Sequence, residues 1–138
     1  KADNMNKWCI IGVYFGELPN YFDLWLKSAQ KNTSVDFIVF SDCSVKWVPD
    51  NVRLIYFTIE KLQKLASYKL GFEVCLERPY KCCDLKPAYG IIFEEYLTDY
   101  EYWGHCDFDL IWGDLCGFFN KYHIKNYDKF LPLGHLSM

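Results

Sequence analysis

Short apolar runs of strand length alternate with segments of helical periodicity, and this alternation constrains the fold more than any other feature of the chain. The run at residues 8–15 (WCIIGVYF) is followed by residues 16–32, in which apolar side chains recur at helical spacing. Further apolar runs follow at residues 35–40 (VDFIVF) and 52–57 (VRLIYF). Strands that alternate with helices favour a mostly parallel sheet with helices on both faces. We therefore predict an α/β fold of that kind.

The rest of the chain continues the alternation. Thr58 is placed to cap a second helix, which Gly71 ends. We expect a third helix to begin at Pro87, because proline suits the first helical position and disfavours helical geometry in the residue before it. The remaining predicted elements are a strand, a short helix and a candidate last strand, at residues 100–106, 114–122 and 129–138.

The composition excludes several classes of protein. The net charge is −3 and no stripe of Lys and Arg dominates, which argues against a nucleic-acid binder. The sequence has no run of transmembrane length and no signal-peptide pattern. The seven cysteines are scattered and lack C-x-x-C spacing, so a disulfide framework or structural zinc is not expected, and a reducing cytoplasmic compartment fits best. A chain of 138 residues is long enough for one domain.

Two aspartates directly follow the strand predicted at residues 100–106, in the stretch YWGHCDFDLIWGD. Asp107 and Asp109 are two residues apart, so in extended backbone their carboxylates face one way while Phe108 points oppositely. Chance alone gives roughly one such pair in a chain of this composition, so the spacing is weak evidence. Their position is stronger evidence, because open α/β sheets bind ligands at the carboxyl ends of strands. We predict that both bind Mn²⁺ or Mg²⁺.

The ends of the first two strands carry further candidates. Tyr14 and Phe15 end the first strand, where they could stack on a nucleobase or simply join the core. Ser41 and Asp42 end the second strand. There an acidic side chain can accept from a ribose hydroxyl or a base N–H, or it can bond its own backbone in a turn. If the strands are parallel, all these side chains lie at the same edge as Asp107.

Basic and imidazole side chains are also candidates for this edge. Lys86 would lie at the mouth of the helix predicted from Pro87, whose free N–H groups and partial positive charge attract phosphate. Alternatively, acidic neighbours such as Asp84 pair with the cations of this stretch. His105 shares a strand face with the first aspartate, so it is either part of the site or a structural histidine. For His135 both roles stay open.

The chain resembles a largely uncharacterised bacterial family of glycosyltransferase-like proteins. The resemblance lies in four stretches: YFGELPNYFDLWLKSAQKN, VDFIVFSD, LERPYKCCDLKPAYG and YWGHCDFDLIWGDL. Members look like nucleotide-sugar transferases of the GT-A type, so the resemblance implies a Rossmann-like nucleotide-binding half. It also implies a D-x-D that holds Mn²⁺ or Mg²⁺ at the donor diphosphate, a nucleoside cradle and a basic residue near the phosphates. The metal-binding role would fall on Asp107 and Asp109, and the nucleoside cradle on Tyr14, Phe15 and Asp42. Lys86 would be the basic residue near the phosphates.

This resemblance implies a metal-dependent glycosyltransferase of bacterial polysaccharide synthesis. The enzyme would move a sugar from a nucleotide-diphosphate donor to a glycan or lipid-linked acceptor, in the cytoplasm or at the inner face of the membrane. A GT-A domain normally continues with an acceptor-binding half, so we expect this chain to be a fragment. Two alternatives stay open: a non-catalytic carbohydrate- or nucleotide-binding module, and a metal-dependent phosphoesterase, because paired aspartates also serve two-metal sites.

Overall fold

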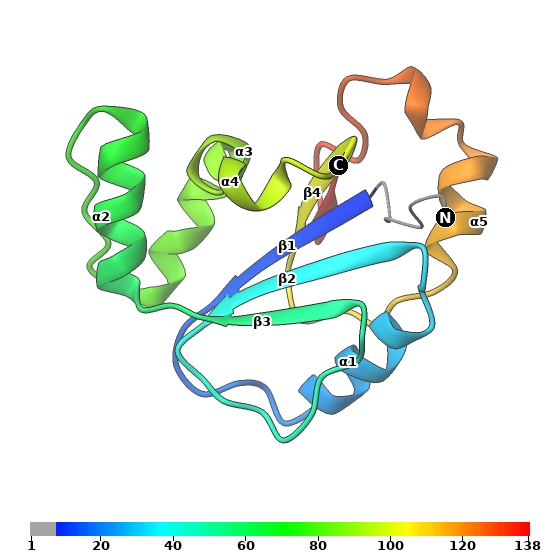
Figure 1. Cartoon of the computed structure of the whole chain (residues 1–138), viewed down its shortest axis with the longest axis horizontal. Coiled ribbons are helices and arrows are strands. Elements are labelled where there is room, and N and C mark those ends of the chain that lie inside the picture. Colours follow the sequence, from blue (N-terminus) through cyan, green and yellow to red (C-terminus); the bar gives the residue numbers. More distant parts are fainter. Residues whose placement is uncertain (1–7) are drawn as a thin grey trace.

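A five-stranded sheet with helices on both faces forms the protein (Figure 1). The computed structural model describes residues 8–138. The sheet order is β3-β2-β1-β4-β5; the first four strands along the chain run parallel and β5 is antiparallel to β4. The strands are β1 (Trp8–Tyr14), β2 (Val35–Ser41), β3 (Val52–Tyr56), β4 (Tyr102–Cys106) and β5 (Leu136–Ser137). The predicted α/β fold with a mostly parallel sheet is confirmed, and the arrangement is Rossmann-like.

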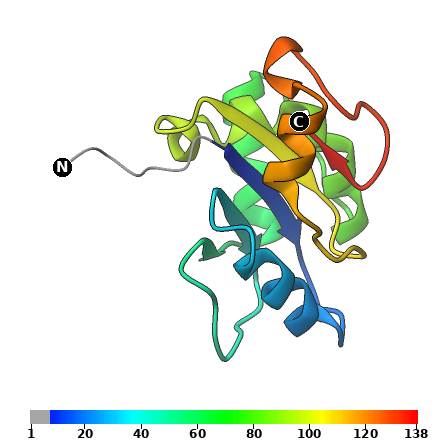
Figure 2. The ribbon, with the colours of Figure 1, turned by 90° about the vertical axis from the view of Figure 1, so that its right-hand side faces the viewer.

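The helices divide between the two faces of the sheet. Figure 2 shows α1 and α5 in front of the sheet and the green helices behind it. Their bounds are α1 (Phe22–Gln30), α2 (Ile59–Leu70), the 3₁₀ helix η1 (Pro79–Ala88), α3 (Tyr89–Ile92), α4 (Glu94–Leu97), α5 (Leu115–Lys121) and the 3₁₀ helix η2 (Ile124–Asn126). None of the helices within residues 8–138 is long and apolar enough to cross a membrane.

Two apolar cores follow from this layering, one on each face. Successive side chains of a strand point to opposite faces, so Ile11 and Ile38 join the core under α2 and α3, while Ile10 and Phe37 join the core under α1 and α5. All four side chains are fully buried. This burial on both faces explains why the central strands are near-continuous apolar runs in the sequence.

The boundaries of α2 are those that the sequence predicts. The hydroxyl of Thr58 accepts a hydrogen bond from the backbone N–H of Lys61 at 3.2 Å. Gly71 adopts the left-handed conformation, with φ of 75°, and its N–H donates to the carbonyl of Ser67 at 3.0 Å. A residue with a Cβ would be strained at such an end, which makes glycine a strong stop signal.

The helix predicted from Pro87 is wrong in its start. Helical backbone begins eight residues earlier, where Pro79 opens η1 after the extended Arg78, and Pro87 lies inside η1. The preference of proline for the first helical position holds, but at Pro79 rather than at Pro87. Lys86 therefore lies in the last turn of η1 and not at a helix mouth, so the helix-terminus argument for phosphate binding does not apply to it.

Candidate metal centre

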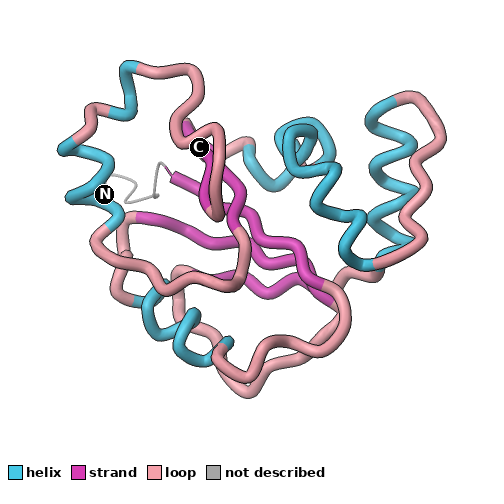
Figure 3. Tube along the Cα trace, turned by 180° about the vertical axis from the view of Figure 1, so that it is seen from behind, coloured by secondary structure: helices cyan, strands magenta, loops and turns pink. Residues whose placement is uncertain are grey.

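A cleft of about 590 Å³ lies at the carboxyl ends of β1 and β4. Figure 3 shows from behind how the strands lie side by side, with loops leaving their ends. Parallel strands bring their carboxyl ends to one edge, which is where ligands bind in such sheets. The lining includes Tyr14, Phe15, Tyr21, Tyr80, Cys83, Lys86, Asp107, Asp109 and His135. The cleft thus combines aromatic rings, one ammonium, two carboxylates and an imidazole.

Asp107, Asp109 and His135 form a compact cluster in this cleft. The Nδ1 atom of His135 lies 3.0 Å from Oδ1 of Asp109 and 3.3 Å from Oδ2 of Asp107. One ligand atom from each side chain lies within 4.8 Å of the other two. Two carboxylates and an imidazole suit divalent cations such as Mn²⁺. The three side chains could therefore hold one such ion at the mouth of the cleft.

Pairing between β4 and β5 brings His135 to the aspartates. Antiparallel register sets His105 opposite Ser137, and just beyond it the backbone N–H of Asp107 donates to the carbonyl of His135 at 2.8 Å. Gly134, with φ of 116°, allows the chain to turn into this pairing. The sequence left the role of His135 open, because nothing in a single chain fixes which residue of a last strand lies opposite the D-x-D.

Phe108 anchors the segment between the two carboxylates. Its ring is buried and packs against Trp25, with ring centroids 5.1 Å apart. The ring lies over Gly12 of β1, where an added Cβ would approach it to 2.4 Å, so any larger residue at position 12 would displace it. The sequence predicted this alternation, with the phenylalanine inward and the two aspartates facing the other way.

The far end of the same segment is held by two buried polar side chains of the α1 region. The backbone N–H of Trp112 donates to the hydroxyl of Ser28 at 3.0 Å. Asn32 accepts from the N–H of Leu115 at 2.9 Å and donates to the carbonyl of Gly113 at 2.9 Å. Residues 107–115 are therefore fixed at both ends, which restricts where the two aspartates can lie.

Lys86 reaches the cluster of Asp107, Asp109 and His135 from η1. Its Nζ forms an ion pair with Oδ1 of Asp107. Burial disfavours the charged ammonium, but the hydrogen bond and charge of Asp107 outweigh it and raise the pKa of Lys86 above its ordinary value. The alternative pairing with Asp84 is not formed; that carboxylate pairs with Lys81 at 3.2 Å. Lys86 is thus a permanent positive charge inside the cleft.

The candidates at the ends of β1 and β2 lie at the predicted edge but differ in access. Tyr14 lines the cleft and packs edge to face on Phe108, whereas Phe15 is 7% exposed and belongs largely to the core. Ser41 is fully buried. Asp42 accepts from the backbone N–H of Gly16 at 2.9 Å and so ties the loop after β2 to the loop after β1. Neither Ser41 nor Asp42 lines the cleft.

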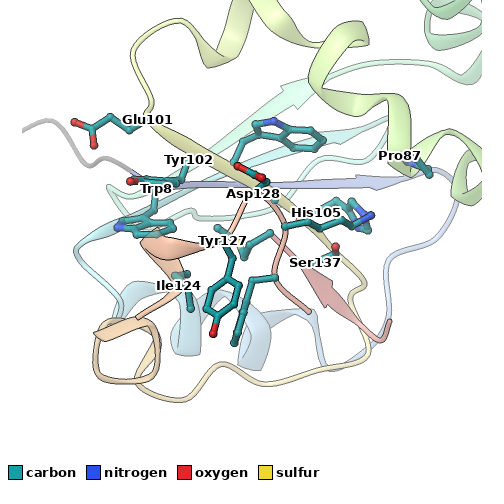
Figure 4. Close-up of a pocket in the computed structure, with 14 residues that line it drawn as sticks. Trp8, Pro87, Glu101, Tyr102, His105, Ile124, Tyr127, Asp128 and Ser137 are labelled. Carbon is teal, nitrogen blue, oxygen red and sulfur yellow. The ribbon is translucent and has the colours of Figure 1, made fainter. Parts of the chain in front are cut away.

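His105 lies in a different pocket from the two aspartates. That pocket, of about 340 Å³, borders β4 and is lined by Trp8, Tyr127 and Ser137 among others (Figure 4). His105 packs edge to face on Tyr89 of α3, with ring centroids 6.2 Å apart, and so faces the same layer of helices as Asp107, which pairs with Lys86 of η1. Burial and, to a smaller extent, the charge of Lys86 lower the pKa of His105, so its imidazole is neutral at pH 7.

Two tyrosines of the cleft were not singled out from the sequence. Tyr80 is 80% exposed and Tyr21 is 38% exposed, and both line the cleft. Exposed rings beside a charged site can stack on a base or pack on a sugar. Their positions in η1 and before α1 carry no sequence signal that distinguishes them from other surface aromatic residues.

Comparisons with known proteins give a family but no activity. A family model matches residues 10–138, from β1 to the end of the described chain, and that family is described as one of unknown function. No curated protein and no solved structure matches the chain.

Proposed function

Since the chain belongs to this family of unknown function (DUF6625), we propose its activity from the cleft itself: metal-dependent glycosyl transfer from a nucleotide-diphosphate sugar. One observation carries the proposal. Asp107 and Asp109, the D-x-D of the resemblance, lie with His135 in a cluster of metal-ligand geometry at the carboxyl edge of a parallel sheet. We propose Mn²⁺ or Mg²⁺ as the ion, a glycan or lipid-linked molecule as acceptor, and bacterial polysaccharide synthesis in the cytoplasm as the setting.

Each part of the cleft has a role in this proposal. A cation on the Asp107–Asp109–His135 cluster would supply Lewis-acid neutralisation of the diphosphate leaving group. Lys86 provides a second positive charge, from a side chain that is only 19% exposed, where water screens it weakly. The exposed rings of Tyr21 and Tyr80 offer surfaces for a base or a sugar. The protein's own contribution is therefore to orient the donor and to stabilise charge.

Titration calorimetry with UDP-sugars and GDP-sugars, in Mn²⁺ and in EDTA, tests this proposal. We expect donor binding that requires Mn²⁺ and that the Asp109→Ala variant loses. Asp99→Ala is the matched control, because Asp99 is exposed and does not line the cleft. Equal affinity in Mn²⁺ and EDTA, or wild-type affinity in Asp109→Ala, would count decisively against a metal-dependent transferase.

A non-catalytic binding module on the same fold is the second candidate, and one observation favours it. Among the described residues, the only carboxylates that line the cleft are those of Asp107 and Asp109, so with both on the cation none is left as a base. Donor hydrolysis or sugar transfer during long incubation would exclude this candidate. Glycan or nucleotide binding that survives EDTA, without turnover, would favour it.

The phosphoesterase alternative finds no comparable support. A two-metal site recruits further ligands, and the nearest candidates in the sequence are His105 and Asp114. Asp114 caps α5 by accepting from the backbone N–H of Gly117 at 2.9 Å, and His105 lines the other pocket. Both side chains therefore have roles away from the aspartate pair.

A further inference from the structure

Lys86 and a divalent cation would compete for the same carboxylate. One oxygen of Asp107, Oδ1, contacts the ammonium of Lys86, and the other, Oδ2, faces the imidazole of His135 at 3.3 Å. The ammonium therefore already neutralises part of the negative charge with which Asp107, Asp109 and His135 would bind a cation. A divalent cation that enters the cluster meets a positive charge in direct contact with one of its own ligands.

We propose that Lys86 is the resting counter-ion of the metal centre and makes binding of the cation depend on a diphosphate. Without a diphosphate, the ammonium stays on Asp107 and keeps cation affinity low. When the diphosphate of a nucleotide binds, its oxygens accept hydrogen bonds from the ammonium. Asp107 is then free to bind the cation. This inference rests on the proposed metal centre and adds the order in which its ligands bind.

Charge and accessibility in the cleft support this exchange. The side chains of Lys86 and Asp107 are 19% and 32% exposed, so the repulsion between an ammonium and a divalent ion is only partly screened by water. Both residues also line the cleft, so a diphosphate bound there would be within reach of the ammonium. Phosphate oxygens form charge-assisted hydrogen bonds with lysine, and its flexible four-carbon side chain lets the ammonium change partner without movement of the backbone.

The exchange predicts positive coupling between the cation and the diphosphate. Coupling free energies are reciprocal, so the diphosphate must raise cation affinity by the same factor by which the cation raises diphosphate affinity. Removal of the ammonium should then have opposite effects on the two ligands. The cation alone should bind more tightly, because Asp107 is free, and the diphosphate should bind more weakly, because it has lost its lysine.

The experiment measures Mn²⁺ binding by the electron paramagnetic resonance of free Mn²⁺, with and without UDP, and UDP binding at saturating Mn²⁺ by calorimetry. In Lys86→Met we expect affinity for Mn²⁺ alone to rise about fivefold or more, the low end of typical coupling between sites. Affinity for UDP should fall by a similar factor. Lys86→Gln should give the same signs. Lys81→Met is the control, because Lys81 pairs with Asp84 on the surface and does not line the cleft.

The outcomes separate this inference from the proposed function. If Lys86→Met and Lys86→Gln, shown by circular dichroism to be folded, bind Mn²⁺ alone no more tightly than wild type, the inference is overturned, whatever UDP does. A joint loss of both affinities would also overturn it, since a merely structural lysine predicts that result. A gain in Mn²⁺ affinity in proteins that never bind a nucleotide-sugar would instead overturn the proposed function and leave the counter-ion role standing.

Discussion

Two polar clusters hold the opposite ends of residues 107–115, and they differ in almost every physical respect. At the far end, Ser28 and Asn32 are buried and neutral, and they bond to backbone groups of the segment. At the near end, Asp107 and Asp109 are partly exposed, carry like charges and share a single imidazole. The far cluster builds the fold, whereas we propose that the near cluster is kept for a ligand.

The two clusters differ mainly in how completely their polar atoms are hydrogen-bonded within the protein. The amide of Asn32 uses both its oxygen and its nitrogen within the protein, bonding to Ser28, Gly113 and Leu115. Buried polar groups with such complete pairing stabilise one arrangement of the chain. The near cluster is less completely paired: the side chains of Asp107 and Asp109 are 32% and 57% exposed, and their contacts are with Lys86 and His135, which can change partner. Charged groups that converge in a cleft are candidates for a binding site.

The largest expected effect is on cation binding at the near cluster. Asp109→Asn removes a charged ligand, and we expect Mn²⁺ affinity in the presence of UDP to fall about 100-fold, or ~2.7 kcal/mol. The free energy of unfolding in urea should stay the same or rise, because one of two like charges is gone. Unchanged Mn²⁺ affinity together with a clear loss of stability would place Asp109 with the structural groups instead.

The far cluster should show the opposite pattern. Asn32→Ala leaves the buried N–H of Leu115 and the carbonyl of Gly113 without their partner, and we expect the free energy of unfolding to fall by about 2 kcal/mol. Urea denaturation monitored by tryptophan fluorescence measures it. Asn126→Ala serves as a control and should change stability little, because Asn126 of η2 is exposed. Equal stabilities of Asn32→Ala and Asn126→Ala would show that the far cluster does not stabilise the fold.

Ser28 contributes a smaller part of the same anchor. Its hydroxyl donates to the carbonyl of Trp25 at 2.8 Å and accepts from the N–H of Trp112 at 3.0 Å. Ser28→Ala should lower the free energy of unfolding by about 1 kcal/mol, since the side chain is small and one buried N–H loses its partner. In a double-mutant cycle, the losses of unfolding free energy in Ser28→Ala and Asn32→Ala should not add up to the loss in the double variant, because both side chains hold the same segment. Strict additivity would indicate two independent anchors.

An ion pair whose residues do not line the cleft should give the smallest effect, and it serves as a reference for Lys86. Lys69 of α2 contacts Glu94 at 2.8 Å and Glu95 at 3.1 Å, and these glutamates raise its pKa above 10.5. Because the folded pKa is raised, the stabilisation is fully present below pH 10.5 and is lost as pH rises through the folded value. The stability difference between wild type and Lys69→Met should therefore shrink from pH 9 to pH 11.5. A difference that grows in that range would contradict the assigned direction.

The sheet was predictable because its signals are local. Apolar runs at β1 and β2 reflect burial on both faces, and Thr58 and Gly71 bound α2 through backbone geometry that only certain residues satisfy. The predicted helix start at Pro87 was wrong because the same local rule also fits Pro79, where η1 begins. Local signals thus fix the type of an element more reliably than its ends.

The candidate site was predictable only in part, because its partners come from distant parts of the chain. The D-x-D could be read directly, and parallel strands led to the common edge. His135 depends on the register of an antiparallel last strand, and the contact between Lys86 and Asp107 depends on how η1 packs beside β4. Asn32 is the last residue of the helical segment predicted at residues 16–32, yet its amide holds residues 113 and 115. Tertiary packing decides all three.

Anomalous diffraction from crystals soaked in Mn²⁺ and UDP tests whether the cluster binds a metal ion. We expect one manganese peak between Asp107, Asp109 and His135, at ligand distances of about 2.1 Å, and no peak there in crystals of Asp109→Asn. A peak elsewhere on the molecule, or none at this cluster at saturating Mn²⁺ and UDP, would contradict the assignment of the cleft as a metal centre.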